Sequence, residues 1–254
     1  MTVTDKAWSR YIAALREMST RAAADVTSYM ATHDFSTYEG RQALISYAYA
    51  VATKYGEGAG SLACAMYDAL AELSGVILPP ADPAPTATME ETARAVVGTL
   101  NQSPVGDLTA DAIGRLARLA GVDTTMQNAI RDGAWWAWIP RGDTCAFCIA
   151  LASNGWQRAS RAAMKGNHAE HVHANCDCTY AVKFDPFSDV EGYDPDRYYE
   201  MYEDSPGRSS QQKINALRRK FYAQNSEEIN EQKRSAYAKR RERESSAAEE
   251  DDIT

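Results

Sequence analysis

The sequence predicts a mainly α-helical protein: an N-terminal helical bundle, a small α+β module stapled by zinc, and a charged C-terminal helix or tail. Three observations predict this fold class. Apolar residues recur at three- and four-residue spacing over residues 5–75, the period of amphipathic helices. Five candidate metal ligands cluster between Cys145 and Cys178. Beyond about Ser226 the apolar positions nearly vanish, which is typical of a solvated charged segment.

The first region, residues 1–78, is expected to form the bundle. Ser36 and Glu39 have the spacing of a capping box, in which each side chain bonds the backbone N–H of the other, so a second helix is expected to start there. Three glycines, at positions 56, 58 and 60, are expected to break or bend that helix, because glycine is a weak helix former. A third apolar stretch, residues 62–73, then contains Cys64, which we interpret as a core thiol.

Residues 79–87 contain four prolines in the stretch Pro79 to Pro85, which remove backbone donors and push their neighbours out of helical conformations. We expect a semi-rigid linker or boundary here. A second helical region, residues 88–140, should follow, opened by a capping box at Thr88 and Glu91. Its further helices are expected at Leu108 to Leu119 and at Thr124 to Trp138.

A Cys/His module is expected at residues 141–204. It contains Cys145-x2-Cys148 and, after 24 residues, His173-x2-Cys176-x-Cys178. Zinc takes four nitrogen or sulfur ligands at tetrahedral corners, and two close-spaced groups joined by a loop supply them. We therefore expect a structural zinc ion bound by four ligands drawn from Cys145, Cys148, His173, Cys176 and Cys178, with His171 as a possible substitute.

Disulfides and unpaired core thiols are alternative interpretations of the four cysteines. The chain starts without an apolar segment behind a basic end, so we expect no export signal and reduced thiols. Cys176 and Cys178 are also poorly placed to bridge each other, because alternate side chains of an extended segment diverge. Zinc is the interpretation that we retain.

An enzymatic site is the main functional alternative. His171, His173 and Glu170 could serve an open zinc site of a hydrolase, in which water occupies one coordination position. His168-Ala-Glu170 has the H-x-E of nucleobase deaminases, but that signature precedes its cysteines, and here Cys145 comes first. Metalloprotease and P-loop motifs are absent from the sequence. We expect no enzyme.

Trp135, Trp136 and Trp138 lie close together before the module. Three tryptophans in four residues are too many for a solvated helix, so we expect them to pack the helix onto the module, to anchor a binding interface, or both. After the cysteines, residues 179–184 alternate as in a strand leaving the metal site, and residues 194–202 suggest a short helix.

The C-terminal region, residues 205–254, is expected to be a charged helix or a disordered tail. Ser209 and Gln212 have capping spacing for a last amphipathic helix. Residues 207–243 hold eleven basic and four acidic residues, although the whole chain of 254 residues has a net charge of −8. The basic tract is expected to be a solvated helix face or a contact for DNA or an acidic partner. No apolar run is long enough to predict a membrane span.

Three short motifs resemble the C-terminal signature of the phage Mu F-like head morphogenesis proteins, in the form found in phages of actinobacteria. They are Arg141-Gly142-Asp143-Thr144-Cys145-Ala146-Phe147-Cys148, Asn154-Gly155-Trp156, and His173-Ala174-Asn175-Cys176-Asp177-Cys178. The family has D-x-x-C-x-x-C followed by H-P-x-C-R-C. Ala174 and Asp177 depart from that pattern, which puts in doubt any contact made by the arginine but leaves the ligands in place.

The resemblance covers about a quarter of the chain, from Thr124 to Phe184. It implies a minor capsid protein of a tailed phage or prophage, located in the capsid interior or portal region of the virion and in the host cytoplasm during assembly. It also implies contacts with portal, major capsid or scaffold protein, and a part in DNA packaging or ejection. Some relatives are labelled capsid maturation proteases, for which these residues offer no nucleophile and base. A free-standing zinc-dependent nucleic-acid binding module is the remaining alternative.

Overall fold

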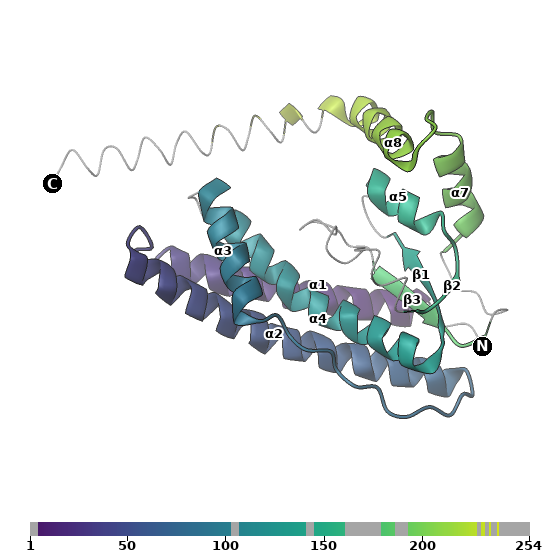
Figure 1. Ribbon diagram of the computed structural model, residues 1–254, viewed down its shortest axis with the longest axis horizontal. Coiled ribbons are helices and arrows are strands. Elements are labelled where there is room, and N and C mark those ends of the chain that lie inside the picture. Colours follow the sequence, from purple (N-terminus) through teal and green to yellow (C-terminus); the bar gives the residue numbers. More distant parts are fainter. Residues whose placement is uncertain are drawn as a thin grey trace.

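The computed structural model describes residues 5–102, 107–140, 145–160, 179–185 and 193–227, together with Asn230, Glu231, Arg234 and Ala238. As the sequence predicts, the described residues are mainly helical, with one small sheet (Figure 1). The helices are α1 (Asp5–Met30), α2 (Tyr38–Leu73), α3 (Met89–Gln102), α4 (Asp107–Asp132), α5 (Ala146–Ala152), α7 (Pro195–Glu203) and α8 (Ser210–Gln224). The strands are β1 (Trp135–Ile139), β2 (Gln157–Arg158) and β3 (Thr179–Lys183).

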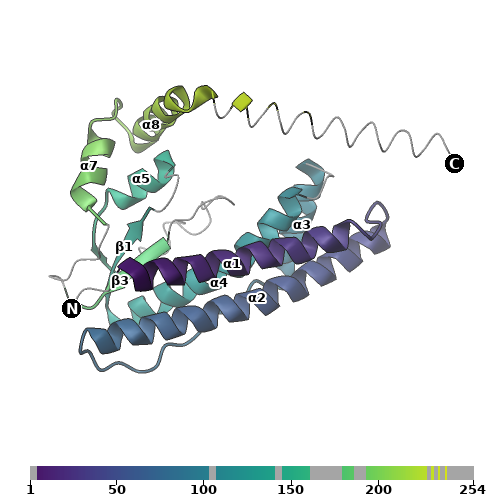
Figure 2. The same cartoon turned by 180° about the vertical axis from the view of Figure 1, so that it is seen from behind.

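The long helices α1, α2 and α4 lie side by side, and α3 packs against α2 and α4 (Figure 1, Figure 2). Away from the sheet, these helices enclose a core of alanine and aliphatic residues that we call the distal core. Its buried members are Ala22, Val26, Met30, Leu44, Ile45, Ala48, Val51, Ala52, Val96, Ala110, Ile113 and Ala117. The predicted N-terminal helical bundle is therefore present, and α4 belongs to it.

Helix α2 is continuous through its three glycines, so the predicted break was wrong. A Cβ atom added at Gly56 would lie 3.0 Å from Thr86 Cγ2, and one at Gly60 would lie 3.4 Å from Pro83 Cβ. The segment that follows α2 thus folds back onto the glycine face of the helix. Packing of this segment compensates for the low helix propensity of glycine, which local sequence alone cannot reveal.

Two of the predicted capping boxes place helix starts correctly, and one is displaced. Thr88 N donates to Glu91 Oε2 at 2.8 Å and Glu91 N donates to Thr88 Oγ1 at 3.2 Å, so both halves of that box form. Gln212 N donates to Ser209 Oγ at 3.3 Å before α8. For α2, however, Thr37 rather than Ser36 accepts a hydrogen bond from the helix, from Gly40 N at 3.1 Å. Asp34 Oδ1 bonds the backbone N–H of Ser36 instead.

Helix α4 is one helix, and the tryptophans that follow it lie in a strand, so the predicted helix from Thr124 to Trp138 was wrong at both ends. Gly133 has φ of 63°, in the left-handed region that glycine favours. Ala134 N donates to Ala129 O at 2.9 Å, and Gly133 N donates to Ile130 O at 3.4 Å. This pair of bonds is the Schellman arrangement, which satisfies the last carbonyl groups and ends the helix.

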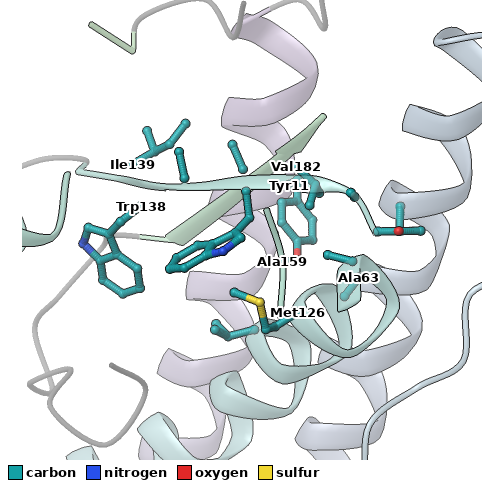
Figure 3. Close-up of a cluster of buried hydrophobic side chains, with 14 of the residues drawn as sticks. Tyr11, Ala63, Met126, Trp138, Ile139, Ala159 and Val182 are labelled. Atoms are coloured by element: carbon teal, nitrogen blue, oxygen red, sulfur yellow. The ribbon is translucent and has the colours of Figure 1, made fainter. Parts of the chain in front are cut away.

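The sheet has the order β2-β1-β3, with both neighbours antiparallel to β1. Trp136 pairs with Val182 and Trp138 with Tyr180, which confirms the strand predicted at residues 179–184. Because alternate residues of a strand point to opposite faces, Trp136 and Trp138 share one face. Figure 3 shows Ile139 on the other side of β1 from Trp138, which lies on the side of the strand that faces Met126 of α4.

A second core joins the bundle to the sheet and α5, and we call it the sheet-end core. Its buried members are Tyr11, Leu15, Ala59, Ala63, Tyr67, Leu70, Val122, Met126, Ala129, Ala134, Trp136, Ala137, Trp138, Ile139, Cys148, Leu151, Ala152, Ala159, Ala181, Val182 and Tyr193. The apolar core therefore runs without interruption from α1, α2 and α4 into the region predicted as the Cys/His module. The domain boundaries stay a prediction, but the two regions share one interior.

The proline-rich segment is held against α4 by hydrogen bonds. Arg131 Nη1 donates to Pro80 O at 2.9 Å, and Arg131 Nη2 donates to Pro79 O at 3.0 Å. Further along, Asn128 Nδ2 donates to Asp82 O at 2.8 Å, and Ala84 N donates to Thr124 Oγ1 at 2.9 Å. One face of α4 thus supplies hydrogen-bond partners to the backbone carbonyl and N–H groups of this segment.

Beyond the sheet, α7 and α8 pack on α5, and α8 also contacts α7. The helix predicted at residues 194–202 is α7, whose N-terminal cap is Asp194. Leu217 of α8 is buried against Ala146 and Ile149 of α5, with Met201 and Phe221 at the edge of the cluster. In the described part of the chain, no helix combines the length and the apolar character needed to cross a membrane.

Candidate functional site

Cys145 and Cys148 stand at the start of α5. Cys145 is the N-cap of this helix, with extended backbone angles, and its Sγ accepts a hydrogen bond from Cys148 N at 3.4 Å. The two sulfur atoms lie 3.5 Å apart, well beyond the about 2.05 Å of a disulfide bond. Both sulfur atoms therefore lie at the start of α5, and a cysteine binds metal as the thiolate.

This geometry fits a zinc ion. Two sulfur ligands at a Zn–S distance of about 2.3 Å in a tetrahedron stand about 3.8 Å apart, close to the distance found here. The other candidate ligands, His171, His173, Cys176 and Cys178, lie outside the described residues, as do His168 and Glu170. Among the described residues, no group of three histidine, cysteine or acidic side chains converges, so the structure does not support a zinc-stapled module by itself.

An aromatic cluster lies at the far end of α5 from the two cysteines. Cys148 is 1% exposed and belongs to the sheet-end core. Tyr193 covers the end of α5, donating its hydroxyl to Ala152 O at 2.9 Å, and burial raises the pKa of this hydroxyl. The ring of Trp156 meets Tyr193 edge to face, with centroids 5.6 Å apart. The ammonium group of Lys183 lies 4.5 Å from the Trp156 ring centroid, in the position of a cation–π contact.

The tryptophans of β1 are part of the interior. Trp136 is 6% and Trp138 is 2% exposed, and both belong to the sheet-end core. This burial agrees with a packing role, although the two rings lie in a strand and not in the expected helix, and it leaves them little surface for a partner. Trp135 is half-buried, and the guanidinium carbon of Arg158 lies 4.8 Å from its ring centroid. An interface role for Trp135 stays a prediction.

A polar cluster that the sequence did not reveal joins α2 to the end of α4. Tyr67 donates its hydroxyl to Asp132 Oδ2 at 2.9 Å, and Arg131 Nε donates to Asp132 Oδ1 at 2.8 Å. Burial opposes ionisation of Asp132, but the hydrogen bonds from Arg131 and Tyr67 outweigh it and hold the pKa of this carboxyl below its ordinary value. Burial, and then the contact with Asp132, raises the pKa of Tyr67. These contacts tie α2 to the end of α4.

Residues 2–205 of the chain match the sequence model of the VG15 protein family. No curated protein and no solved structure matches the chain. The family match takes in the bundle, the sheet and α5 together, in agreement with the shared interior of these parts. Because it covers far more than half of the 254 residues, the chain belongs to the VG15 family of viral gene products, and the protein is a phage protein.

Proposed function

We propose that this protein is a minor capsid protein of a tailed phage or prophage, of the Mu F-like head morphogenesis type, which acts near the portal during head assembly. Its membership of a phage protein family over residues 2–205 is the observation that carries the proposal. The resemblance of the cysteine and histidine motifs to the Mu F-like signature supplies the finer assignment. In this proposal the protein is structural, without enzymatic activity, and resides in the virion.

The second part of the proposal is a closed structural zinc site. Cys145 and Cys148 provide two sulfur ligands with fitting separation, and two of the three residues His173, Cys176 and Cys178 provide the rest, with His171 as a substitute. When bound, zinc would supply on the order of 10 kcal/mol of apparent folding free energy, which a small loop-rich module needs. The N-cap position of Cys145 fixes one sulfur on the rigid start of α5, so the ion would be tied directly to the sheet-end core.

The metal assignment is tested by elemental analysis of purified, reduced protein, with a thiol count before and after chelation. We expect one zinc per chain and four protected thiols. Cys148→Ser should lose the metal, whereas Cys64→Ser is the matched control, since Cys64 lies on α2 and is not one of the candidate ligands. A full zinc equivalent retained by Cys148→Ser would sink the assignment of this ligand.

The same preparation separates the structural site from an open hydrolytic site. Glu170 is the carboxylate that would activate water in the metal-dependent protease or nuclease that stands as the alternative. Glu170→Gln should leave head assembly unchanged if the zinc site is structural. Loss of assembly in a Glu170→Gln protein that keeps its zinc and its melting temperature would favour the enzyme instead.

The assembly role is tested in the phage itself. Deletion of the gene should yield defective heads, seen by electron microscopy, and supply of the wild-type protein in trans should restore them. Mass spectrometry of purified virions should find the protein in a few copies, and cross-linking should join it to the portal, major capsid or scaffold protein. Normal, infectious heads without any copy of this chain would overturn the proposal.

Packaged DNA is the further partner that we propose, through the basic tract of residues 207–243. Six bases of this tract lie beyond α8: Lys233, Arg234, Lys239, Arg240, Arg241 and Arg243. Truncation after Asn225 removes all six and leaves α8 in place. DNA affinity should fall steeply with salt in the full chain, because phosphate contacts release counterions, and should be largely lost on truncation. Equal affinity of the truncated and full chains would exclude these bases as the contact.

A further inference from the structure

A pocket of about 400 Å³ lies between the segment that precedes α3, the start of α3, and one stripe of α4. Its walls are largely aliphatic and its polar groups are mostly acidic or neutral. The lining comprises Ala84, Pro85, Thr86, Ala87, Thr88, Glu91, Leu116, Leu119, Ala120, Asp123 and Gln127. The pocket is rigidly framed, because Ala84 N bonds Thr124 of α4 and the capping box of Thr88 and Glu91 fixes the opposite wall.

Asp123 lines this pocket but takes part in none of the contacts that hold its walls together. It sits half-buried on α4, one turn after Leu119 and one turn before Gln127, and forms no hydrogen bond or ion pair with any described residue. Burial, and secondarily the nearby charge of Glu91, raises the pKa of Asp123 to about 6. Two carboxylates without a lining cation make this a place where a positive charge is favoured.

The lining selects one kind of cation. The aliphatic side chains Leu116 and Leu119 suit the methylene stem of a lysine or arginine, and the carboxylates suit its charged head. A bare metal ion would find two carboxylates here and no third acidic, histidine or cysteine ligand among the described residues. The chemistry therefore points to a long basic side chain delivered by a protein.

Helix α8 carries three consecutive basic residues that could deliver it. Arg218, Arg219 and Lys220 follow one another on α8 and are exposed, and no described residue forms an ion pair with them. By contrast, Arg131 is engaged by Asp82 and Asp132, and Lys213 by Glu203. Helix α8 packs on α5 and α7, on the side of the sheet away from α2 and α3 (Figure 1, Figure 2). These bases cannot enter the pocket of their own chain unless α8 detaches from α5 and α7.

Charge favours contact between copies. Residues 1–206 hold 16 basic and 26 acidic residues, a net charge of −10, and residues 207–243 have a net charge of +7. We propose that the pocket at Asp123 and Glu91 receives an arginine or lysine side chain from α8 of a second copy of the protein. The contact joins two different surfaces, so it is heterologous, and repetition closes it into a ring or extends it into a filament. The six bases beyond α8 remain available to DNA.

The experiment measures self-association of the full-length, nuclease-treated protein by analytical ultracentrifugation across protein and salt concentrations. The wild type should associate at low salt and dissociate as salt screens the contact. Asp123→Asn should weaken association about tenfold or more. Glu90→Gln is the matched control, because Glu90 is exposed on the same first turn of α3 but does not line the pocket, and it should associate like the wild type.

A mixing experiment sharpens the test. The pocket variant Asp123→Asn keeps its basic helix, and the helix variant Arg218→Gln/Arg219→Gln/Lys220→Gln keeps its pocket. Each should be monomeric alone, and the mixture should form a 1:1 dimer that grows no further, because its two remaining surfaces are both defective. Wild-type protein that stays monomeric at low salt, variants that associate like the wild type, or an equimolar mixture without dimer would each overturn the proposal. None of these outcomes depends on zinc or on the role in head assembly.

Discussion

The two cores of this protein are built in different ways. The distal core consists of alanine and aliphatic residues from four helices, with no tryptophan among its buried members. The sheet-end core contains Trp136, Trp138 and Tyr67, and draws its residues from helices, strands and α5. Small residues let helices approach closely over their whole length, whereas large rings fill the uneven space where a sheet meets helix ends. The distal core therefore depends on the close approach of helix backbones, and the sheet-end core depends on a few large side chains.

The sheet end should therefore be the more sensitive to removal of one side chain. Trp138→Ala empties the position of a ring that is 2% exposed and is expected to lower the free energy of unfolding by about 3–5 kcal/mol. Trp135→Ala, at the half-buried neighbour, should cost less. Chemical denaturation followed by far-UV circular dichroism measures both. Equal losses for the two variants would mean that burial of Trp138 does not stabilise the sheet end as described.

The distal half should instead be sensitive to added volume. A Cβ atom at Gly114 of α4 would lie 2.6 Å from Ser19 O of α1, a backbone atom that cannot rotate away. Gly114→Ala is expected to destabilise the protein by about 3 kcal/mol. Gly98→Ala on α3 is the control, since its new methyl group meets nothing within 4 Å, and it should stabilise by up to about 1 kcal/mol. Thermal unfolding of the two variants measures both changes in stability. A change in the same direction for both variants would contradict the close contact of α1 and α4.

A third test concerns the ionisation of Asp123, a partly buried carboxyl group on α4. The pKa of Asp123 is raised from 3.8 to about 6, so the folded state favours the protonated carboxyl. Its stabilising contribution is present below about pH 4 and is lost as pH rises through about 6. Asp123→Asn should therefore be more stable than the wild type by about 2 kcal/mol at pH 8, with the difference shrinking toward pH 4. Measurements at high salt keep association from contributing. A pH-independent difference would show that Asp123 titrates normally.

The smallest effect is expected at the start of α3, outside both cores. Thr88→Ala removes the side chain that accepts from Glu91 N and should cost about 1 kcal/mol. Glu91→Gln keeps a side-chain oxygen that can accept from Thr88 N and should cost less. Urea denaturation with an unchanged m-value would measure this local loss. A cost as large as that of Trp138→Ala would show that the segment before α3 contributes to the sheet-end core.

Local sequence signals predicted the parts of the fold that depend on local chemistry. The caps at Thr88 and Ser209 were found because a hydroxyl and a partner three residues later satisfy helix N–H groups wherever they occur. The strand at β3 was found from alternation. The strand at β1 was missed because Trp135 to Ile139 was joined to the preceding helix, although Asp132-Gly133 offers a helix stop and aromatic residues favour strands.

Other features depend on contacts that no local pattern encodes. The continuity of α2 through Gly56 and Gly60 follows from the segment that packs on them. The isolation of Asp123 follows from a pocket whose walls come from two parts of the chain, residues 84–91 and residues 116–127. For the metal site, spacing predicted the cysteine pair, whose sulfur separation fits zinc. The remaining ligands lie outside the described residues, and their role stays a prediction.

The clamp that Arg131 forms on Pro79 and Pro80 has a practical consequence for labelling the protein in a virion. Ile77, two residues before the clamp, is 99% exposed. An epitope tag inserted after Ile77 would extend from the segment after α2 and leave the hydrogen bonds of Arg131 in place. The same tag inserted after Asp82 would pull the backbone away from Asn128. Ile77 is therefore the position at which a fluorophore or a gold particle would report where the bundle sits in the head.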